Sequence, residues 1–341
     1  MFAVLLRYFK SLGSRIDRGL LYKLIFIALL IIIISAIIVF NVEPEGQFNN
    51  VFDASWWAIV TATTVGYGDF FPISYSGRIV AIILMFTGIG LFGGITATIT
   101  EIFIKIEKRR ELGQLQADYE GHIIICGWCD KTKEMVKQIL SENIENKQIV
   151  LIANIESDPF PDNNLIHFIH GKIDEEESLN KASIKNAKTA IILNEDNNDA
   201  TTVLSALTIN SLNPDLYTIA EISKEENAVH LKNAGVDEIV INNNVNSRLM
   251  VRTAFYHGTS KVFNELLCNK VGNEIYMLEA SEDTYEKNYK DMLNIIKEKN
   301  NATLLGLKRN GKILINPDFD EKIMKGDHFI YIARDRLLNI I

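Results

Sequence analysis

The chain has 341 residues, of which 48% are hydrophobic and 23% are charged, and its formal net charge is −8. These averages exclude a disordered, collagen-like or disulfide-scaffold protein. The charge is unevenly divided: residues 1–111 hold 10 Lys+Arg and 8 Asp+Glu, which leaves 25 and 35 of the totals for residues 112–341. The second part is therefore acidic. This argues against a nucleic-acid partner, because phosphate binding needs a basic face.

Two apolar segments in the first third of the chain are long enough to cross a membrane. The first, residues 20–40, has only Lys23 and Ser35 as clearly polar side chains. Its helix would span about 31 Å, close to the roughly 30 Å hydrocarbon core. No small-x-small cleavage site follows it, so we do not expect a cleaved signal peptide. The second, residues 79–104, is rich in Gly and Thr, and Glu101 is its single ionisable residue. We therefore expect two membrane-spanning helices surrounded by lipid.

The charges that flank these segments predict their orientation. Basic side chains lie on the outer flanks of both segments, at Arg7, Lys10, Arg15 and Arg18 before the first and at Lys105, Lys108, Arg109 and Arg110 after the second. The connection between the segments carries Glu43, Glu45 and Asp53. By the positive-inside rule, both termini and the acidic residues 112–341 face the cytoplasm. We expect a multi-pass protein of the cell (inner) membrane.

The connection between the two segments predicts a re-entrant helix followed by an ion-coordinating strand. Residues 52–64 are apolar and aromatic but too short to span the membrane, and Thr64-Val65-Gly66-Tyr67-Gly68-Asp69 follows. Irregular backbone at membrane depth must be buried in protein or line a water-filled path. Carbonyl groups of successive residues can replace the water around a cation where alternate residues adopt positive φ, which Gly66 and Gly68 permit. One chain cannot close such a ring, so four chains around an axis are implied.

Residues 64–68 resemble the TVGYG selectivity filter of potassium channels. The resemblance implies a homotetrameric pore of the two-helix type, with potassium ions held by Thr64, Val65, Gly66, Tyr67 and Gly68. The chain has no further span and no Arg-rich helix, so we expect no voltage sensor.

The second segment is expected to line the inner pore, and it contains four glycines within seven residues, Gly88, Gly90, Gly93 and Gly94. Glycine weakens a helix, so such a cluster marks either a bending point or a close-packing surface. The channel family often hinges its inner helix at a glycine in a position like Gly88. Hinge and packing both remain open for this residue.

Residues 121–257 alternate short apolar runs with amphipathic stretches, which predicts a doubly wound parallel sheet of the Rossmann-like α/β class. The expected strands are 122–126, 148–153, 165–169, 189–193, 216–221 and 238–241. The expected helices are 131–140, 177–184, 200–212 and 225–233. After this sheet, Asn310-Gly311 lies between two apolar runs and predicts a hairpin in a small α+β lobe.

The cytoplasmic part resembles an RCK domain (regulator of potassium conductance), which is related to the TrkA and KTN families, and the whole chain resembles prokaryotic calcium-gated channels with one such domain per subunit. The expected divisions are a pore domain over residues 1–110, a linker over 111–120, a Rossmann-like lobe over 121–257, and a helical crossover with a C-terminal lobe over 258–341. In that family the RCK domains pair into a gating ring that pulls the inner helices open.

The residues expected to bind a regulatory ligand match known nucleotide-binding patterns only in part. A dinucleotide turn needs glycine at positions 127, 129 and 132, and only Gly127 is present. The second strand ends in Asn154 rather than the Asp or Glu that holds ribose hydroxyls. NAD is therefore disfavoured, while a mononucleotide remains possible.

The resemblance to calcium-gated channels places ion ligands at Asn194, Glu221 and Ser223, with Asp196 in the adjoining polar loop. Calcium takes six to eight oxygens, several of them carboxylates, so a divalent site here centres on Glu221. The alternative is that the loop caps the next helix.

Cys126 and Cys129 form a CxxC pair at a helix start, for which we favour packing over redox or metal chemistry. The favoured function is a ligand-gated potassium channel without enzymatic activity. The alternatives are a non-conducting membrane sensor or scaffold, whose lobe reports nucleotide or redox state, and a membrane-tethered oxidoreductase, which the missing dinucleotide residues disfavour.

Overall fold

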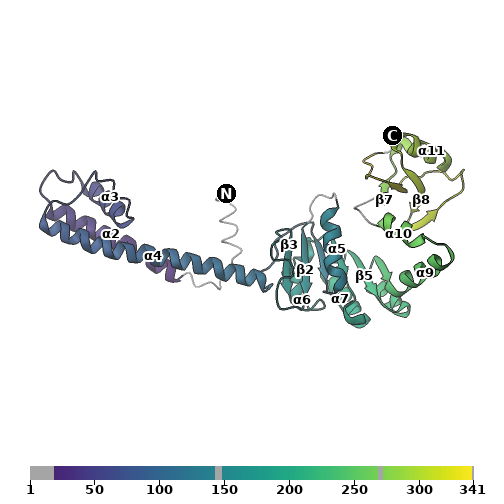
Figure 1. Ribbon diagram of the computed structural model, residues 1–341, viewed down its shortest axis with the longest axis horizontal. Coiled ribbons are helices and arrows are strands. Elements are labelled where there is room, and N and C mark those ends of the chain that lie inside the picture. The colour runs from purple at the N-terminus through teal and green to yellow at the C-terminus, as the bar shows by residue number, and fades with distance from the viewer. Residues whose placement is uncertain (1–18, 143–147, 268–271, 340–341) are drawn as a thin grey trace. The chain divides into compact units, whose positions relative to one another are not determined.

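The computed structural model describes residues 19–142, 148–267 and 272–339. The chain divides into two units, one ending at Glu111 and the other beginning at Leu112 (Figure 1). The basic residues expected before the first span lie outside the described residues.

The first unit contains two long apolar helices, α2 (Gly19–Val42) and α4 (Tyr75–Glu111). Only 28% of the most apolar window of α2 and 17% of that of α4 are buried. A core helix of a soluble protein would be mostly buried, so these exposed apolar surfaces match contact with lipid and confirm the two predicted helices. α4 extends seven residues beyond the predicted span. The positive charges of Lys108, Arg109 and Arg110 in its last turn interact favourably with the partial negative charge at this end of the helix.

A short helix, α3 (Val51–Ala62), lies between the two long ones. The side chain of Asn50 caps it by accepting a hydrogen bond from the Asp53 N–H at 2.9 Å. The Asp53 carboxylate interacts favourably with the partial positive charge at this end of the helix. Its buried face, which includes Trp57 and Ala58, packs with Val39 of α2 and Leu84 of α4. α3 therefore sits in a small apolar core formed with both long helices.

The second unit begins with a six-stranded parallel sheet in the order β3-β2-β1-β4-β5-β6, which confirms the predicted doubly wound class. The strands are β1 (Ile123–Cys126), β2 (Ile149–Ala153), β3 (Ile166–His170), β4 (Thr189–Ile192), β5 (Tyr217–Ile222) and β6 (Glu238–Ile241). Strands β1 to β3 are added toward one edge of the sheet and β4 to β6 toward the other, so the strand order reverses at β1, whose neighbours are β2 and β4. Ligands in open α/β sheets bind outside the carboxyl ends of the strands at such a reversal.

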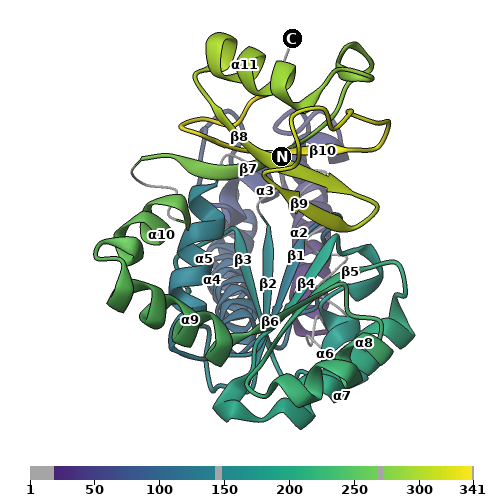
Figure 2. The same cartoon turned by 90° about the vertical axis from the view of Figure 1, so that its right-hand side faces the viewer.

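Helices cover both faces of this sheet (Figure 2). α5 (Asp130–Ser141) packs on one face, where Val136 meets Ile125 and Leu151. The other face carries α6 (Glu176–Lys181), α7 (Asp199–Leu212) and α8 (Ala228–Asn233). β2 is fully buried along its length, as expected for a parallel strand between two helical layers.

Two predicted helices begin or end differently from the expectation. The helix predicted for residues 177–184 ends at Lys181, because Ser183 adopts a left-handed conformation with φ 53°, and a short 3-10 turn follows at Ile184–Asn186. The helix predicted for residues 225–233 begins with a 3-10 turn, Glu225–Asn227, before α8. Neither change alters the order of the sheet.

The end of the chain forms a separate four-stranded antiparallel sheet in the order β7-β10-β8-β9. Its strands are β7 (Glu274–Glu279), β8 (Thr303–Arg309), β9 (Lys312–Ile315) and β10 (His328–Ala333), and α11 (Tyr289–Asn300) covers one face. The predicted hairpin is present: Asn310 and Gly311 both have positive φ, 48° and 76°, as a type I′ turn requires. Two further helices, α9 (Asn242–Phe255) and α10 (Thr259–Leu267), connect the two sheets along the chain.

The linker that begins the second unit is hydrogen-bonded to the parallel-sheet lobe. The Gly113 carbonyl accepts from the His170 N–H at 3.0 Å, and the Ala117 N–H donates to the Lys181 carbonyl at 2.8 Å. A Cβ on Gly113 would lie 2.3 Å from the His170 nitrogen, and the φ of Gly113 is 62°. The linker is therefore attached backbone to backbone, at a point where only glycine fits.

A buried ion pair closes the C-terminal sheet. The Arg309 guanidinium donates to both Asp327 carboxylate oxygens at 2.8 Å and to Glu321 at 2.6 Å. Asp327 is fully buried. Burial alone would raise the pKa of Asp327, but the hydrogen bonds from Arg309 and the Met324 N–H lower it below its ordinary value of 3.8. The stability from this pair is therefore present above about pH 4 and is lost as the pH falls through the lowered pKa.

We expect Asp327→Asn to destabilise the C-terminal sheet by about 2 kcal/mol, because it leaves the Arg309 charge without its buried partner. This corresponds to roughly 30-fold faster amide hydrogen exchange in β8 and β10 of the full chain at neutral pH. The exposed Asp320→Asn variant is the matched control and should exchange like the unmodified chain. Equal protection in all three proteins would contradict the role assigned to the pair.

Candidate functional site

Residues 64–68, which follow α3 and which we call the filter strand although they pair with no β-strand of the described chain, have the alternating backbone that ion coordination needs. Thr64, Gly66 and Gly68 have φ values of 63°, 60° and 77°, while Val65 and Tyr67 between them do not have positive φ. Alternation of this kind lets successive carbonyls face the same side of the strand. The two glycines were expected to take this conformation, but Thr64 was not. All five residues are exposed in the single chain, so they are available to face other copies around an axis.

The carboxyl end of α3 leads directly into this strand. The Val60 carbonyl accepts hydrogen bonds from the N–H groups of Val65 and Gly66 at 3.0 and 3.2 Å. The last turn of a helix carries partial negative charge, which attracts cations. α3 therefore fixes the start of the strand and adds a field that favours a positive ion there.

The outer end of the strand is held by an aromatic and polar bracket. The Trp56 Nε1–H donates to the Asp69 carboxylate at 2.8 Å, and the Trp56 ring stacks on Tyr67 with the ring centroids 5.9 Å apart and 7° between their planes. Trp56 lies on α3, so the bracket ties the strand to the helix behind it. The Tyr67 side chain thus packs away from the row of carbonyls.

A carboxylate at the end of α2 ties the beginning of α4 to the same frame. Glu43 accepts from the Ile73 N–H at 2.9 Å and from the Ser74 hydroxyl at 2.7 Å. Gly77 lies against this carboxylate, and a Cβ there would be 2.0 Å from a Glu43 oxygen. Gly77 is therefore needed for the carboxylate to reach the helix start. The sequence analysis did not identify either residue as part of this frame.

Gly88 lies where α4 crosses the end of α3. It is buried, and a Cβ there would lie 3.0 Å from the Cα and the carbonyl oxygen of Ala62. The close-packing alternative is thus observed at Gly88. α4 is continuous through this residue, and a hinge at Gly88 stays a prediction.

The candidate ligand residues of the second unit lie at or near the carboxyl ends of the parallel strands. Gly127 follows β1 with a φ of 116°, and a Cβ there would be 3.2 Å from the Leu193 Cβ. Cys126 is fully buried, and burial together with the negative charge of Glu195 raises the pKa of its thiol to about 12. Cys129 is the residue before α5, and its N–H bonds the Thr132 hydroxyl at 2.9 Å. A protonated, buried Cys126 fits the packing interpretation of the CxxC pair.

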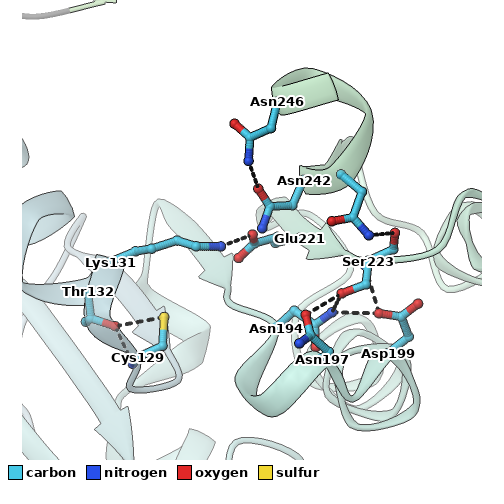
Figure 3. Close-up of polar contacts among 11 residues, drawn as sticks. Cys129, Lys131, Thr132, Asn194, Asn197, Asp199, Glu221, Ser223, Asn242 and Asn246 are labelled. Atoms are coloured by element: carbon cyan, nitrogen blue, oxygen red, sulfur yellow. Dashed lines mark hydrogen bonds and ion pairs between the residues drawn. The ribbon is translucent and has the colours of Figure 1, made fainter. Parts of the chain in front are cut away.

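A polar network joins the ends of β4 and β5 (Figure 3). The Asn194 side-chain amide donates to Asp199 at 2.6 Å and to the Ser223 hydroxyl at 3.0 Å. The Asp199 carboxylate also accepts from the N–H groups of Ser223 and Lys224 and from Asn227. Burial alone would raise the pKa of Asp199, but these hydrogen bonds lower it overall. Asp199 therefore joins two loops instead of capping its own helix.

Glu221 lies beside this network and forms an ion pair with Lys131 of α5 (Figure 3). The side chain of Glu221 is 12% exposed, whereas that of Lys131 is 51% exposed. Glu221 Oε2 and Asn194 Oδ1 are buried acceptors with no hydrogen-bond partner among the described residues. Two such oxygens on adjacent strands suit a ligand that brings positive charge or N–H or O–H donors.

The other predicted ligand residues do not join this group. Asn154 is exposed at the end of β2, and Asp196 is exposed with a left-handed φ of 49°. In the described part of the chain, no group of three or more His, Cys, Asp or Glu side chains is arranged to hold a metal ion. The sequence analysis missed Lys131, because its partner Glu221 is 90 residues away and no local pattern links the two.

Comparisons with known proteins agree with this architecture. Residues 26–105 match the ion channel family model, residues 123–242 match the TrkA-N domain, and residues 243–339 match the family described as Castor and Pollux, part of voltage-gated ion channel. The calcium-gated potassium channel TvoK of Thermoplasma volcanium is 28% identical over 95% of this chain and 94% of its own length. The putative potassium channel protein YugO of Bacillus subtilis is 27% identical over 90% of this chain and 94% of its own length.

Solved structures show the same fold. The GsuK channel has a TM-score of 0.50 and 18% identity, covering 93% of this chain and 57% of that one. The human SLO3 gating ring has a TM-score of 0.52 and 16% identity, covering 63% of this chain and 44% of that one. Three domain matches follow one another along the chain, and the relatives align with it along nearly their whole length. The chain is therefore similar, from its ion channel domain through its TrkA-N domain, to prokaryotic potassium channels.

Proposed function

We propose that this chain forms a homotetrameric, potassium-selective channel whose pore is gated by ligand binding to its cytoplasmic RCK domains. The observation that carries the proposal is the alternating backbone of residues 64–68, which is exposed in the single chain. At membrane depth, the carbonyl oxygens of these residues find polar partners only in ions and in other copies of the chain. Four such strands around an axis form a cage of carbonyl oxygens that replaces the hydration shell of potassium. No enzymatic step is part of this proposal.

The basic residues that follow the second span support a cytoplasmic position for the RCK domains, by the positive-inside rule. The hydrogen-bonded linker supports mechanical coupling, because the Gly113 and Ala117 backbone groups move with the parallel-sheet lobe. A ligand that changes the positions of these lobes therefore acts on the chain that continues from α4.

Pairing of RCK domains is supported by α9 and α10, whose residues are all at least partly exposed in the described chain. Their exposed apolar side chains include Val245, Met250, Val251, Phe255, Val262 and Leu267. Exposed apolar side chains on two successive helices favour a protein–protein contact over scattered single exposures. We infer that two copies pair through these helices and that the pairs assemble into a gating ring.

The regulatory ligand is proposed to bind at the ends of β4 and β5. A divalent cation such as calcium would use Glu221 and Asn194 oxygens, and a nucleotide would present donors to the same atoms. Because calcium takes six to eight oxygens, the few found here require water or a neighbouring copy to complete the site. Lys131 already neutralises Glu221, so a cation binds there in competition with the ammonium group.

Purified full-length chain in potassium-loaded liposomes should give potassium flux that barium blocks, with little sodium flux. Gly66→Ala should abolish the flux, since a left-handed conformation costs a residue with a Cβ about 1–2 kcal/mol in every subunit. Gly46→Ala is the matched control, because Gly46, like Gly66, has positive φ and no neighbour within 4 Å of an added Cβ, but it lies between α2 and α3, outside residues 64–68. A folded tetramer without flux would favour the non-conducting sensor, and equal sodium and potassium flux would refute selectivity.

Trp56→Phe should weaken selectivity while leaving the pore assembled, because it keeps the ring beside Tyr67 but removes the hydrogen bond to Asp69. Loss of a hydrogen bond to a charged group costs about 1.5 kcal/mol, so we expect the potassium-to-sodium permeability ratio to fall about threefold or more. Ser55→Ala is the control, since its hydroxyl bonds only the Val51 carbonyl within α3. An unchanged ratio in Trp56→Phe would show that the bracket does not hold the filter.

Calcium dependence of flux tests the regulatory site. Lys131→Gln should lower the calcium concentration for half-maximal flux about tenfold, because the cation no longer competes with an ammonium group. Glu221→Gln should abolish the calcium response. Lys133→Gln removes a charge from the same turn without touching Glu221 and should behave like the unmodified chain. Identical calcium curves for Lys131→Gln and Lys133→Gln would overturn the competition.

A further inference from the structure

The turn between β1 and α5 already holds an anion supplied by the chain itself. The Trp128 N–H donates to Glu195 Oε1 at 2.6 Å, across 67 residues of sequence. The Glu195 Cγ lies 3.3 Å from the position of a Cβ on Gly127, so the carboxylate stem packs directly on the glycine. The carboxylate thus lies against the backbone of the first turn of the Rossmann-like lobe.

This is the position at which such folds present backbone N–H groups to phosphate. The turn follows the first strand at the reversal of the sheet, and it opens the 12-residue helix α5, whose positive end favours an anion. A distance of 2.6 Å is that of a strong, charge-assisted hydrogen bond. The Glu195 carboxylate therefore makes the contact that a phosphate oxygen would make.

The second positive group of the same turn is also neutralised within the chain. Lys131 lies in the first turn of α5, and its ammonium is paired with Glu221 at the end of β5. Both groups that would attract a phosphate, the Trp128 N–H and the Lys131 ammonium, thus have carboxylate partners from neighbouring strands. This second contact is independent of the first, because it comes from another strand and another side chain.

The loop that carries Glu195 is bent to reach the turn. Asp196 and Asn197 have positive φ values of 49° and 56°, a conformation that residues other than glycine rarely adopt. Asn197 Oδ1 accepts from the Ser223 hydroxyl at 2.9 Å, so the loop is fixed at both ends. Release of Glu195 would free this loop and, through Ser223, the end of β5.

We propose that Glu195 is an internal anion that occupies the phosphate position of the Rossmann-like lobe. A phosphate-bearing ligand then binds the turn only by displacing Glu195, and the carboxylate sets how strongly the lobe rejects such ligands. The proposal rests on the proposed function in taking the carboxyl ends of the strands of the parallel sheet as the regulatory site. Its test measures binding and not conduction, so the two fail separately.

The test is equilibrium binding of inorganic pyrophosphate to the purified full-length channel, because this probe needs no pocket for a base. Glu195→Gln should bind pyrophosphate at least tenfold more tightly than the unmodified chain, since it removes the competing charge and keeps the side-chain length. Glu134→Gln is the matched control: it removes one exposed charge from α5 away from the turn and should bind like the unmodified chain. ADP should bind the unmodified chain, Glu195→Gln and Glu134→Gln with the same order of affinities as pyrophosphate.

A second variant keeps the proposal testable if Glu195→Gln does not fold. Glu195→Asp retains the charge but is one methylene shorter, so it should leave the Trp128 N–H and bind pyrophosphate more tightly than the unmodified chain by a smaller factor. Equal pyrophosphate affinity in the unmodified chain and in whichever variant folds would overturn the proposal. So would an equal gain in Glu134→Gln, because the effect would then be one of net charge alone.

Discussion

The pore unit depends on the need of backbone carbonyl groups for partners at membrane depth. Helices satisfy this need internally, but the strand from Thr64 to Gly68 does not, because its alternating φ values leave successive carbonyls free to face one side. In the proposed channel, an ion and three further copies complete what the single chain lacks. The proposed tetramer and the proposed ion coordination therefore follow from one constraint, and a chain with an ordinary helix or hairpin at this place would need neither.

The surroundings of the strand are arranged to keep this unusual backbone in place. α3 supplies hydrogen bonds at its start, and Trp56 and Asp69 brace its outer end. Gly88 brings α4 against the end of α3, so the inner helix and the filter frame share a packed contact. A displacement of α4 at Gly88 therefore also shifts the end of α3. Packed interfaces of this kind tend to switch between discrete arrangements, which suits a gate.

The fold was predictable from the sequence wherever a local pattern carried it. The two long helices, the positions of the parallel strands along the chain and the Asn310-Gly311 hairpin each follow from periodicity or turn chemistry within a few residues. The filter glycines were predictable for the same reason. The ends of the helices near Ser183 and Glu225 were not, since left-handed and 3-10 turns depend on contacts outside the local pattern. The same limit applies to the cytoplasmic site, where the partners of Trp128 and Lys131 are 67 and 90 residues away.

At the carboxyl ends of β1, β4 and β5, two charged contacts are already made within the chain, and this determines how a charged ligand can act there. Lys131 forms an ion pair with Glu221, and Glu195 accepts a hydrogen bond from the Trp128 N–H. A charged ligand therefore exchanges one contact for another. Its net binding free energy is then a difference between two similar interactions. A ligand shifts a conformational equilibrium only by its differential affinity for the two states. The displaced side chains belong to separate elements, Lys131 to α5 and Glu195 to the segment after β4. Each exchange therefore frees a different element from its contact, and that release is the differential term. A cleft with preformed, unpaired ligands would bind more tightly but would change less.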